Sequence, residues 1–292
     1  MINRTASYLI YPCTLLSAIG LYTLISDVGW IFPFAAFGAI TAGVLLIIAA
    51  EYVMPYAKSW RPRADELWTD FLYVGIVQIA LPRLLAIAVA ILLAAYIGTA
   101  APLFSFWPHD WPVAAQAGLL VVSADFMRYW LHRAAHTAPL LWRLHAVHHS
   151  PHKLYWLNTS RFHPIEKIMQ FSLDSLPFAL MGVDPRILGF WFVIYSVNGF
   201  FQHSNIHLRF GVLSTVFSTA EMHRWHHSKV MEESNKNYAN IFIVWDRLLG
   251  TYYRPVDRDV GELGLINRDY PTGFVRQMIS PFIAGLDRQQ RR

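Results

Sequence analysis

Long apolar stretches separated by short polar segments organise the first 120 residues of the chain. Residues 9–25, 30–50 and 84–107 form three such stretches, and a fourth begins at residues 112–122. A helix that crosses a bilayer needs about 20 mostly apolar residues. A buried helix of a soluble protein does not account for three stretches of this length in 292 residues. The pattern therefore predicts an integral membrane protein with several spanning helices.

The segment between the second and third stretches has a different pattern. Residues 51–70 are polar and interrupted by prolines, which predicts a surface segment, with Trp60 and Trp68 as anchors at the membrane interface. Residues 71–80 are apolar but too short to span before Pro82, so we expect them to lie along the membrane face.

Two shorter apolar segments, residues 168–183 and 187–201, flank a tight turn. They predict a hairpin that returns the chain to the side from which it came. Length alone does not distinguish a full hairpin from a re-entrant one.

Histidine is concentrated around these later segments. The chain has 13 histidines, and eight of them form an H-x-x-x-H motif and two H-x-x-H-H motifs: His132, His136, His145, His148, His149, His223, His226 and His227. On a helix, residues at i, i+3 and i+4 lie on one face. Each H-x-x-H-H motif is therefore expected to aim two or three imidazoles at one point. Eight converging imidazoles are too many for one metal ion and about right for two.

The first two motifs are expected on adjacent helices. Residues 121–131 predict a helix leaving the membrane, whose extension carries His132 and His136 on one face. Pro139 ends this helix, and residues 140–149 predict a second one. The two motifs then face each other across a short turn, and the third motif must fold back onto them.

The clustering of the histidines, more than any single one, indicates metal binding. Imidazole is the commonest neutral metal ligand. No cysteine lies near the motifs, which argues against a structural zinc site with thiolates, and the H-E-x-x-H motif of metalloproteases is absent. A two-metal site of neutral imidazoles suits redox-active iron. Iron activates oxygen, and the membrane location indicates a lipid substrate whose acyl chain enters from the bilayer.

Charge placement predicts the orientation of the chain. Only 15% of residues are charged and the net charge is +5. Basic residues follow the second and fourth apolar stretches but not the first and third, so the positive-inside rule places the N-terminus, residues 51–70 and the histidine-rich region in the cytoplasm. No dense basic patch with exposed aromatic residues suggests a nucleic-acid partner. Cys13 is the single cysteine, so no intrachain disulfide forms. The first stretch lacks a good cleavage site and is expected to be a retained helix.

The order of the three histidine motifs resembles that of the fatty acid hydroxylase/sterol desaturase superfamily of membrane di-iron enzymes. Other segments carry the resemblance beyond the histidines, over about residues 120–255: 142–151 (WRLHAVHHSP), 161–166 (RFHPIE), 201–205 (FQHSN), 222–228 (MHRWHHS), 237–238 (NY) and 245–252 (WDRLLGTY). The first hundred residues resemble the family only in hydropathy and in a P-Y…W segment at residues 55–60. The resemblance implies an all-α fold, namely a polytopic membrane protein with a cytoplasmic, histidine-lined helical cap. We expect a single domain over residues 1–292, with membrane-spanning helices in 1–118, the di-iron region in 119–255 and a cytoplasmic tail in 256–292.

The resemblance also implies a set of site residues. Two iron ions are to be ligated by the eight histidines of the motifs, and the resemblance adds His203 and His163. The family pattern does not require His207, and its role stays open. Ligating histidines usually donate their second N–H to a carboxylate or carbonyl, for which Glu166, Asp246 and Asp125 are the candidates.

The function that follows is O2-dependent hydroxylation of a membrane lipid or sterol. Desaturation by the same centre is the alternative, and a membrane metal transporter is a third hypothesis from a different class. No flavin or haem motif is present, so an external electron donor is expected: a ferredoxin, a cytochrome or a reductase. The absence of a di-lysine tail and of a fused cytochrome domain favours a bacterial inner membrane over the endoplasmic reticulum. The sequence does not indicate which lipid or which carbon is attacked.

Overall fold

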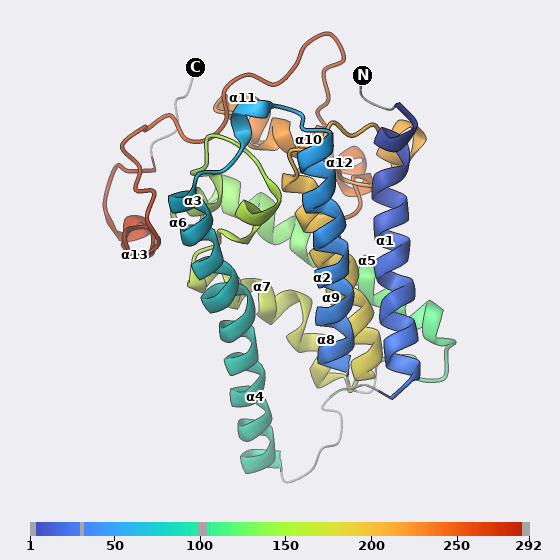
Figure 1. Cartoon of the computed structure of the whole chain (residues 1–292). Helices are drawn as coiled ribbons and strands as arrows, with labels where there is room; N and C mark the ends of the chain where they lie inside the picture. The colour runs from blue at the N-terminus through green and yellow to red at the C-terminus, as the bar shows by residue number, and fades with distance from the viewer. Residues whose placement is uncertain (1–3, 30–31, 98–103, 105, 288–292) are drawn as a thin grey trace.

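Long helices run side by side and end in a cap of short helices and loops (Figure 1). The computed structural model describes residues 4–29, 32–97, 104 and 106–287. Within these residues no β-strand forms, so the predicted all-α fold is confirmed. The long helices are α1 (Arg4–Asp27), α2 (Phe32–Val53), α3 (Ala64–Leu72) with the π-helix η2 (Tyr73–Ala80) and α4 (Leu81–Ile97), then α5 (Val113–Thr137) and α9 (Pro185–His203).

Shorter elements build the cap and its connections. They are η1 (Lys58–Trp60), α6 (Pro139–His149), η3 (Trp156–Ser160), α7 (Pro164–Asp174), α8 (Leu176–Leu180), η4 (Gly211–Thr215), α10 (Ala220–His226), α11 (Met231–Ser234), α12 (Val244–Leu248), α13 (Phe274–Ile279) and η5 (Ser280–Phe282).

Three helical segments of the described chain are long and apolar enough to cross a membrane: Thr5–Asp27, Pro33–Val53 and Ala64–Leu92. The first two match the predicted stretches. The third begins earlier than predicted, because residues 71–80 do not lie along the membrane face but continue α3 into α4. Pro82 does not end this helix, since the π-helix before it shifts the hydrogen-bond register and accommodates the missing N–H.

The fourth predicted stretch became the long helix α5. Its 25 residues include Asp125, Arg128 and Arg133, and it is not among the three segments apolar enough to cross a membrane. As predicted, one helix carries both His132 and His136 and ends just before Pro139, which occupies the first turn of α6. Proline suits that position because its missing N–H would have no partner there.

Helices α1, α2 and α9 share one apolar core that includes Tyr11, Ile47 and Val197. Close approach depends on Gly189 of α9, where an added Cβ would lie 2.0 Å from Tyr22 Oη. The Tyr22 hydroxyl instead donates to the Arg186 carbonyl at 2.8 Å. This packing holds α9 against the two N-terminal spans and so fixes the position of His203 at its C-terminal end.

The predicted hairpin is present, with unequal arms. The first arm consists of α7 and α8, with 11 and 5 residues, and the second is the 19-residue α9. Asp184 caps α9 by accepting from the Arg186 backbone N–H at 2.8 Å. The first arm is too short to cross a bilayer, which needs about 20 helical residues.

The N-terminal end of α1, residues 51–70 and the cap lie at the same end of the molecule (Figure 1). The alternation predicted from charge placement therefore agrees with the direction of the helices.

Candidate metal centre

Nine histidines converge in two adjacent groups. In each group, every histidine can place one ring nitrogen within 4.8 Å of those of the others. The first group has five members: His132, His136, His145, His149 and His226. The second has four: His148, His203, His223 and His227. The structure therefore brings together all eight motif histidines and His203, from the consecutive helices α5 and α6, from the end of α9, and from α10 with the residue that follows it. The rings of His149 and His227 stack across the two groups with centroids 4.3 Å apart.

Each H-x-x-H-H motif contributes to both groups. His145 and His149 join the first group while His148 joins the second, and His223 and His227 join the second while His226 joins the first. A helix turns by about 100° per residue, so side chains at i+3 and i+4 point about 100° apart. Two imidazoles of each motif therefore converge on one point, as expected, and the third joins the other group.

Within the groups, the Nε2 atoms face one another. His132 and His145 Nε2 are 3.0 Å apart, and His136 and His149 Nε2 are 3.1 Å apart. His149 Nε2 also lies 3.1 Å from His226 Nε2. The second group is similar, with 3.3 Å between His203 and His148 Nε2 and 3.0 Å between His227 and His223 Nε2.

Six of the nine Nδ1 atoms face an acceptor, whereas those of His223 and His227 are buried without a hydrogen-bond partner. Three face backbone carbonyl oxygens: His132 faces that of Tyr238 at 2.6 Å, His148 that of Arg161 at 3.2 Å, and His226 that of Lys236 at 2.7 Å. Three face side-chain oxygens: the Nδ1 atom of His136 faces Asn235 at 3.1 Å, that of His145 faces Glu166 at 2.8 Å, and that of His203 faces Asn158 at 2.8 Å. An acceptor at Nδ1 keeps the proton there and leaves the Nε2 lone pair available to a metal.

Burial keeps these rings neutral. It lowers the pKa of His148 to about 3 and that of His226 to about 4, and it lowers the pKa of each of the other seven well below the ordinary value. Neighbouring imidazoles add to the effect, because one protonated ring disfavours protonation of the next. Neutral imidazoles with converging lone pairs are a donor set that fits two transition-metal ions.

Asp125 and Asp246, two of the carboxylates expected to accept a hydrogen bond from a ligating histidine, bind backbone N–H groups instead. Asp125 accepts hydrogen bonds from the backbone N–H groups of Ile241 and Phe242 at 2.8 and 2.9 Å. Asp246 accepts from those of Tyr238 and Ala239 at 2.8 and 2.9 Å. Neither contacts a histidine of the groups; they hold the loop whose Tyr238 carbonyl does. Of the three candidates, only Glu166 contacts a histidine of the groups, through its 2.8 Å contact with His145.

His163 and His207 lie outside both groups. His163 caps α7, where its Nδ1 accepts from the Ile165 backbone N–H at 3.2 Å, and its Nε2 lies 3.1 Å from the Met278 carbonyl oxygen. The resemblance implied that His163 ligates a metal, but the structure places it at the N-terminal cap of α7, away from both groups.

The sequence did not point to several residues that support the site. Asn158 and Asn235 hold His203 and His136, although an isolated asparagine carries no sequence signal. The segment predicted as polar surface also supplies two interior carboxylates. Glu51 Oε1 accepts from the backbone N–H groups of Trp156 and Asn205 at 2.7 and 2.8 Å, and Asp70 is fully buried against Arg161 and Tyr155.

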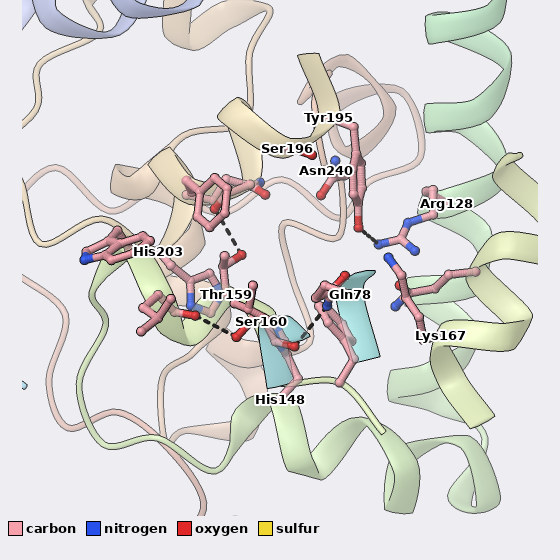
Figure 2. A pocket seen from close by; sticks show the side chains of 18 of the residues that line it. Gln78, Arg128, His148, Thr159, Ser160, Lys167, Tyr195, Ser196, His203 and Asn240 are labelled. Carbon is pink, nitrogen blue, oxygen red and sulfur yellow. Dashed lines mark hydrogen bonds between the residues drawn. The ribbon is translucent and has the colours of Figure 1, made fainter. Parts of the chain in front are cut away.

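A cavity of about 280 Å³ leads from the histidine groups toward the membrane helices. Five histidines line it (His132, His145, His148, His203 and His223), together with apolar side chains of α2, η2 and α9 that include Phe37, Val44, Val74 and Phe192. Figure 2 shows polar residues on its wall, among them Tyr195 and Arg128. The cavity has the shape and lining to hold an apolar chain with one end beside the metal centre.

A helical membrane base joined to a buried, all-histidine metal centre defines a class of membrane-bound, metal-dependent oxidoreductases. Residues 117–251 match the fatty acid hydroxylase family model. Ornithine lipid hydroxylase OlsE of Rhizobium tropici is 37% identical over 250 residues, covering 82% of this chain and 73% of that protein. The chain belongs to the fatty acid hydroxylase/sterol desaturase superfamily, and it is an oxidoreductase.

More distant relatives cover less of the sequence. Alkylglycerol monooxygenase of Homo sapiens is 28% identical over 208 residues, which are 70% of this chain and 45% of that protein. The aldehyde decarbonylase GL1-8 of Oryza sativa subsp. indica, described for very-long-chain aldehydes, is 33% identical over 147 residues, 49% of this chain and 54% of that protein. No solved structure matches the chain.

Proposed function

We propose that the protein is a di-iron, O2-dependent lipid hydroxylase. One observation carries the proposal: two groups of imidazoles, with Nε2 atoms converging, border a cavity that is also lined by apolar side chains of the membrane helices. Iron bound there supplies the activation of O2 needed to attack an unreactive C–H bond. His132, His136, His145, His149 and His226 would hold one ion, and His148, His203, His223 and His227 the other.

The protein would orient the ligands and the substrate and exclude water from the metal centre. Glu166 and the carbonyl oxygens around the groups orient the imidazoles. Eight of the nine histidines are buried, and His132 is partly buried. The apolar wall of α2 and η2 would align the acyl chain so that one carbon lies beside the metals. Excluding water also protects a reactive centre from side reactions.

We propose an acylated amino acid lipid as the substrate to be tested first. The proposal is supported by the relative in Rhizobium tropici, whose name states that it hydroxylates ornithine lipid and which matches 82% of this chain. The reaction consumes one O2, two electrons and two protons, inserts one oxygen atom into a C–H bond and releases water. An external ferredoxin, cytochrome or reductase would supply the electrons, and the active site would face the cytoplasm of a bacterial inner membrane.

Lipid mass spectrometry on cells with and without the protein tests the proposal. A lipid class that gains one oxygen atom supports hydroxylation, whereas loss of two hydrogen atoms would make the protein a desaturase. Purified protein should hold two irons and consume O2 when lipid and reductant are added. Readily exchanged zinc, with metal uptake into vesicles and no lipid change, would contradict the enzyme and support a transporter; transporters place ligands along a path across the bilayer.

A further inference from the structure

Two cationic side chains lie side by side on the cavity wall, and the histidine groups do not use them. Arg128 is on α5 one helical turn before His132, and Lys167 follows Glu166 on α7. They are only 7% and 8% exposed, and both line the cavity. Figure 2 shows them reaching from separate helices into the same space beside Tyr195.

Tyr195 of α9 positions both cations. Arg128 Nη2 donates to the Tyr195 hydroxyl oxygen at 2.8 Å. The Arg128 guanidinium carbon and Lys167 Nζ lie 5.1 and 5.4 Å from the centroid of the Tyr195 ring, within the range of cation–π attraction. Three helices that pack around the cavity therefore hold two positive charges at one place.

These charges are only partly matched by carboxylates. Asp174 Oδ2 lies 3.5 Å from Arg128 Nη1, but that Nη1 is buried and has no hydrogen-bond partner. Across the described ranges, 4–29, 32–97, 104 and 106–287, no carboxylate forms an ion pair with Lys167. Glu166, the other carboxylate nearby, is close enough for both cations to act on it electrostatically, but it forms no ion pair with either, and its Oε1 contacts His145. Buried charges are normally paired, so a single ion pair for two cations leaves room for a second anion.

We propose that Arg128 and Lys167 bind the anionic group of the lipid substrate, a carboxylate or a phosphate. This inference rests on the proposed hydroxylase function and specifies its substrate class. Guanidinium is well shaped for either group, and the lysine adds a point charge beside it. An anion held there lies within reach of the histidine groups, since Arg128 and His132 are four residues apart, about 6 Å along the helix axis.

The same arrangement selects against neutral lipids. A substrate without an anionic group would leave Lys167 buried without an ion pair and Arg128 with Asp174 as its single carboxylate partner, so part of the desolvation cost of these charges would not be offset. Sites built to pair a polar group reject analogues that lack it far more strongly than apolar pockets reject a missing methylene.

Equilibrium lipid binding tests the proposal on the full-length protein in a neutral maltoside detergent. Oxygen and reductant are left out, so that no turnover occurs. The probes are an N-acyl ornithine lipid, its carboxamide, phosphatidylglycerol and a neutral alkylglycerol. We expect at least one of the two lipids that carry an anionic group, the ornithine lipid and phosphatidylglycerol, to bind about tenfold more tightly than the carboxamide and the alkylglycerol, which carry none. Preference for the ornithine lipid assigns a carboxylate, and preference for phosphatidylglycerol assigns a phosphate. Equal affinity for all four lipids overturns the proposal.

Substitutions locate the binding group. Lys167→Gln and Arg128→Gln should each bring the affinities for lipids with and without an anionic group to within about twofold of each other. Arg186→Gln, which removes an exposed arginine at the start of α9, is the matched control and should keep the wild-type preference. A wild-type preference retained in both cavity variants overturns the assignment. If a variant fails to fold, the comparison of the four lipids on the wild-type protein still tests the proposal. A protein that binds the anionic lipid but never oxidises it refutes the proposed function and leaves this inference standing.

Discussion

Glu166 Oε1 lies 2.8 Å from His145 Nδ1, with both side chains buried beneath the first histidine group. Residues 145 and 166 belong to different helices, so this contact links α6 to α7 at the metal centre. A carboxylate behind a ligating imidazole fixes the orientation of the ring and raises its basicity.

Replacing Glu166 by Gln is therefore expected to weaken metal binding about 10–100-fold, because glutamine keeps the shape but loses the charge. Competition with a chelator, followed by metal analysis of the protein, measures the change. The control is Glu232→Gln, at an exposed position of α11. Equal metal retention in both variants would show that the contact with His145 does not support ligation.

His226→Ala and His148→Ala should each abolish activity and lower bound iron while leaving membrane insertion intact, because each removes one ligand from a different group. His163→Ala removes a ring that caps α7 outside the groups and should leave the iron content unchanged. Iron analysis of the three purified variants distinguishes them. A loss of iron in His163→Ala equal to that in His226→Ala would contradict the ligand set taken from the structure.

Asp125→Asn should destabilise the protein by about 2 kcal/mol, since a buried charged acceptor of three N–H donors is lost. For a protein of this size the loss corresponds to a fall of about 4–8 °C in the unfolding midpoint. Thermal unfolding followed by circular dichroism measures it, with exposed Asp27→Asn as the control. An unchanged midpoint would mean that Asp125 does not hold the loop before α12.

Gly189→Ala should also destabilise the fold, by about 1–3 kcal/mol, because the new Cβ would overlap the Tyr22 hydroxyl. Removing that hydroxyl in the double variant Tyr22→Phe/Gly189→Ala should recover part of the loss. Gly20→Ala is the control, as a Cβ there meets no atom within 4 Å. Thermal unfolding of the wild type, Tyr22→Phe, Gly189→Ala, the double variant and Gly20→Ala completes the comparison. Additive losses without recovery would refute the close contact of α1 with α9.

Much of the architecture was predictable because it depends on local pattern. Apolar stretches of about 20 residues predict spanning helices whatever surrounds them, and α1 and α2 follow that rule. The path of residues 71–80 was not predictable, since a π-helical register that accommodates Pro82 depends on the neighbouring helices. The same limit applies to Asp70, which looked like surface and is buried against Arg161.

The sequence by itself determined that this is a membrane protein with histidines able to bind metal, because the apolar stretches and the histidine motifs are both patterns of nearby residues. Only the tertiary structure decided how the imidazoles are shared. His148 and His149 are neighbours in the chain, yet helical rotation turns them toward different groups, where His203 and His226 arrive from distant helices. The cation pair of Arg128 and Lys167 was likewise decided by packing, since their proximity depends on how α5, α7 and α9 meet around a cavity.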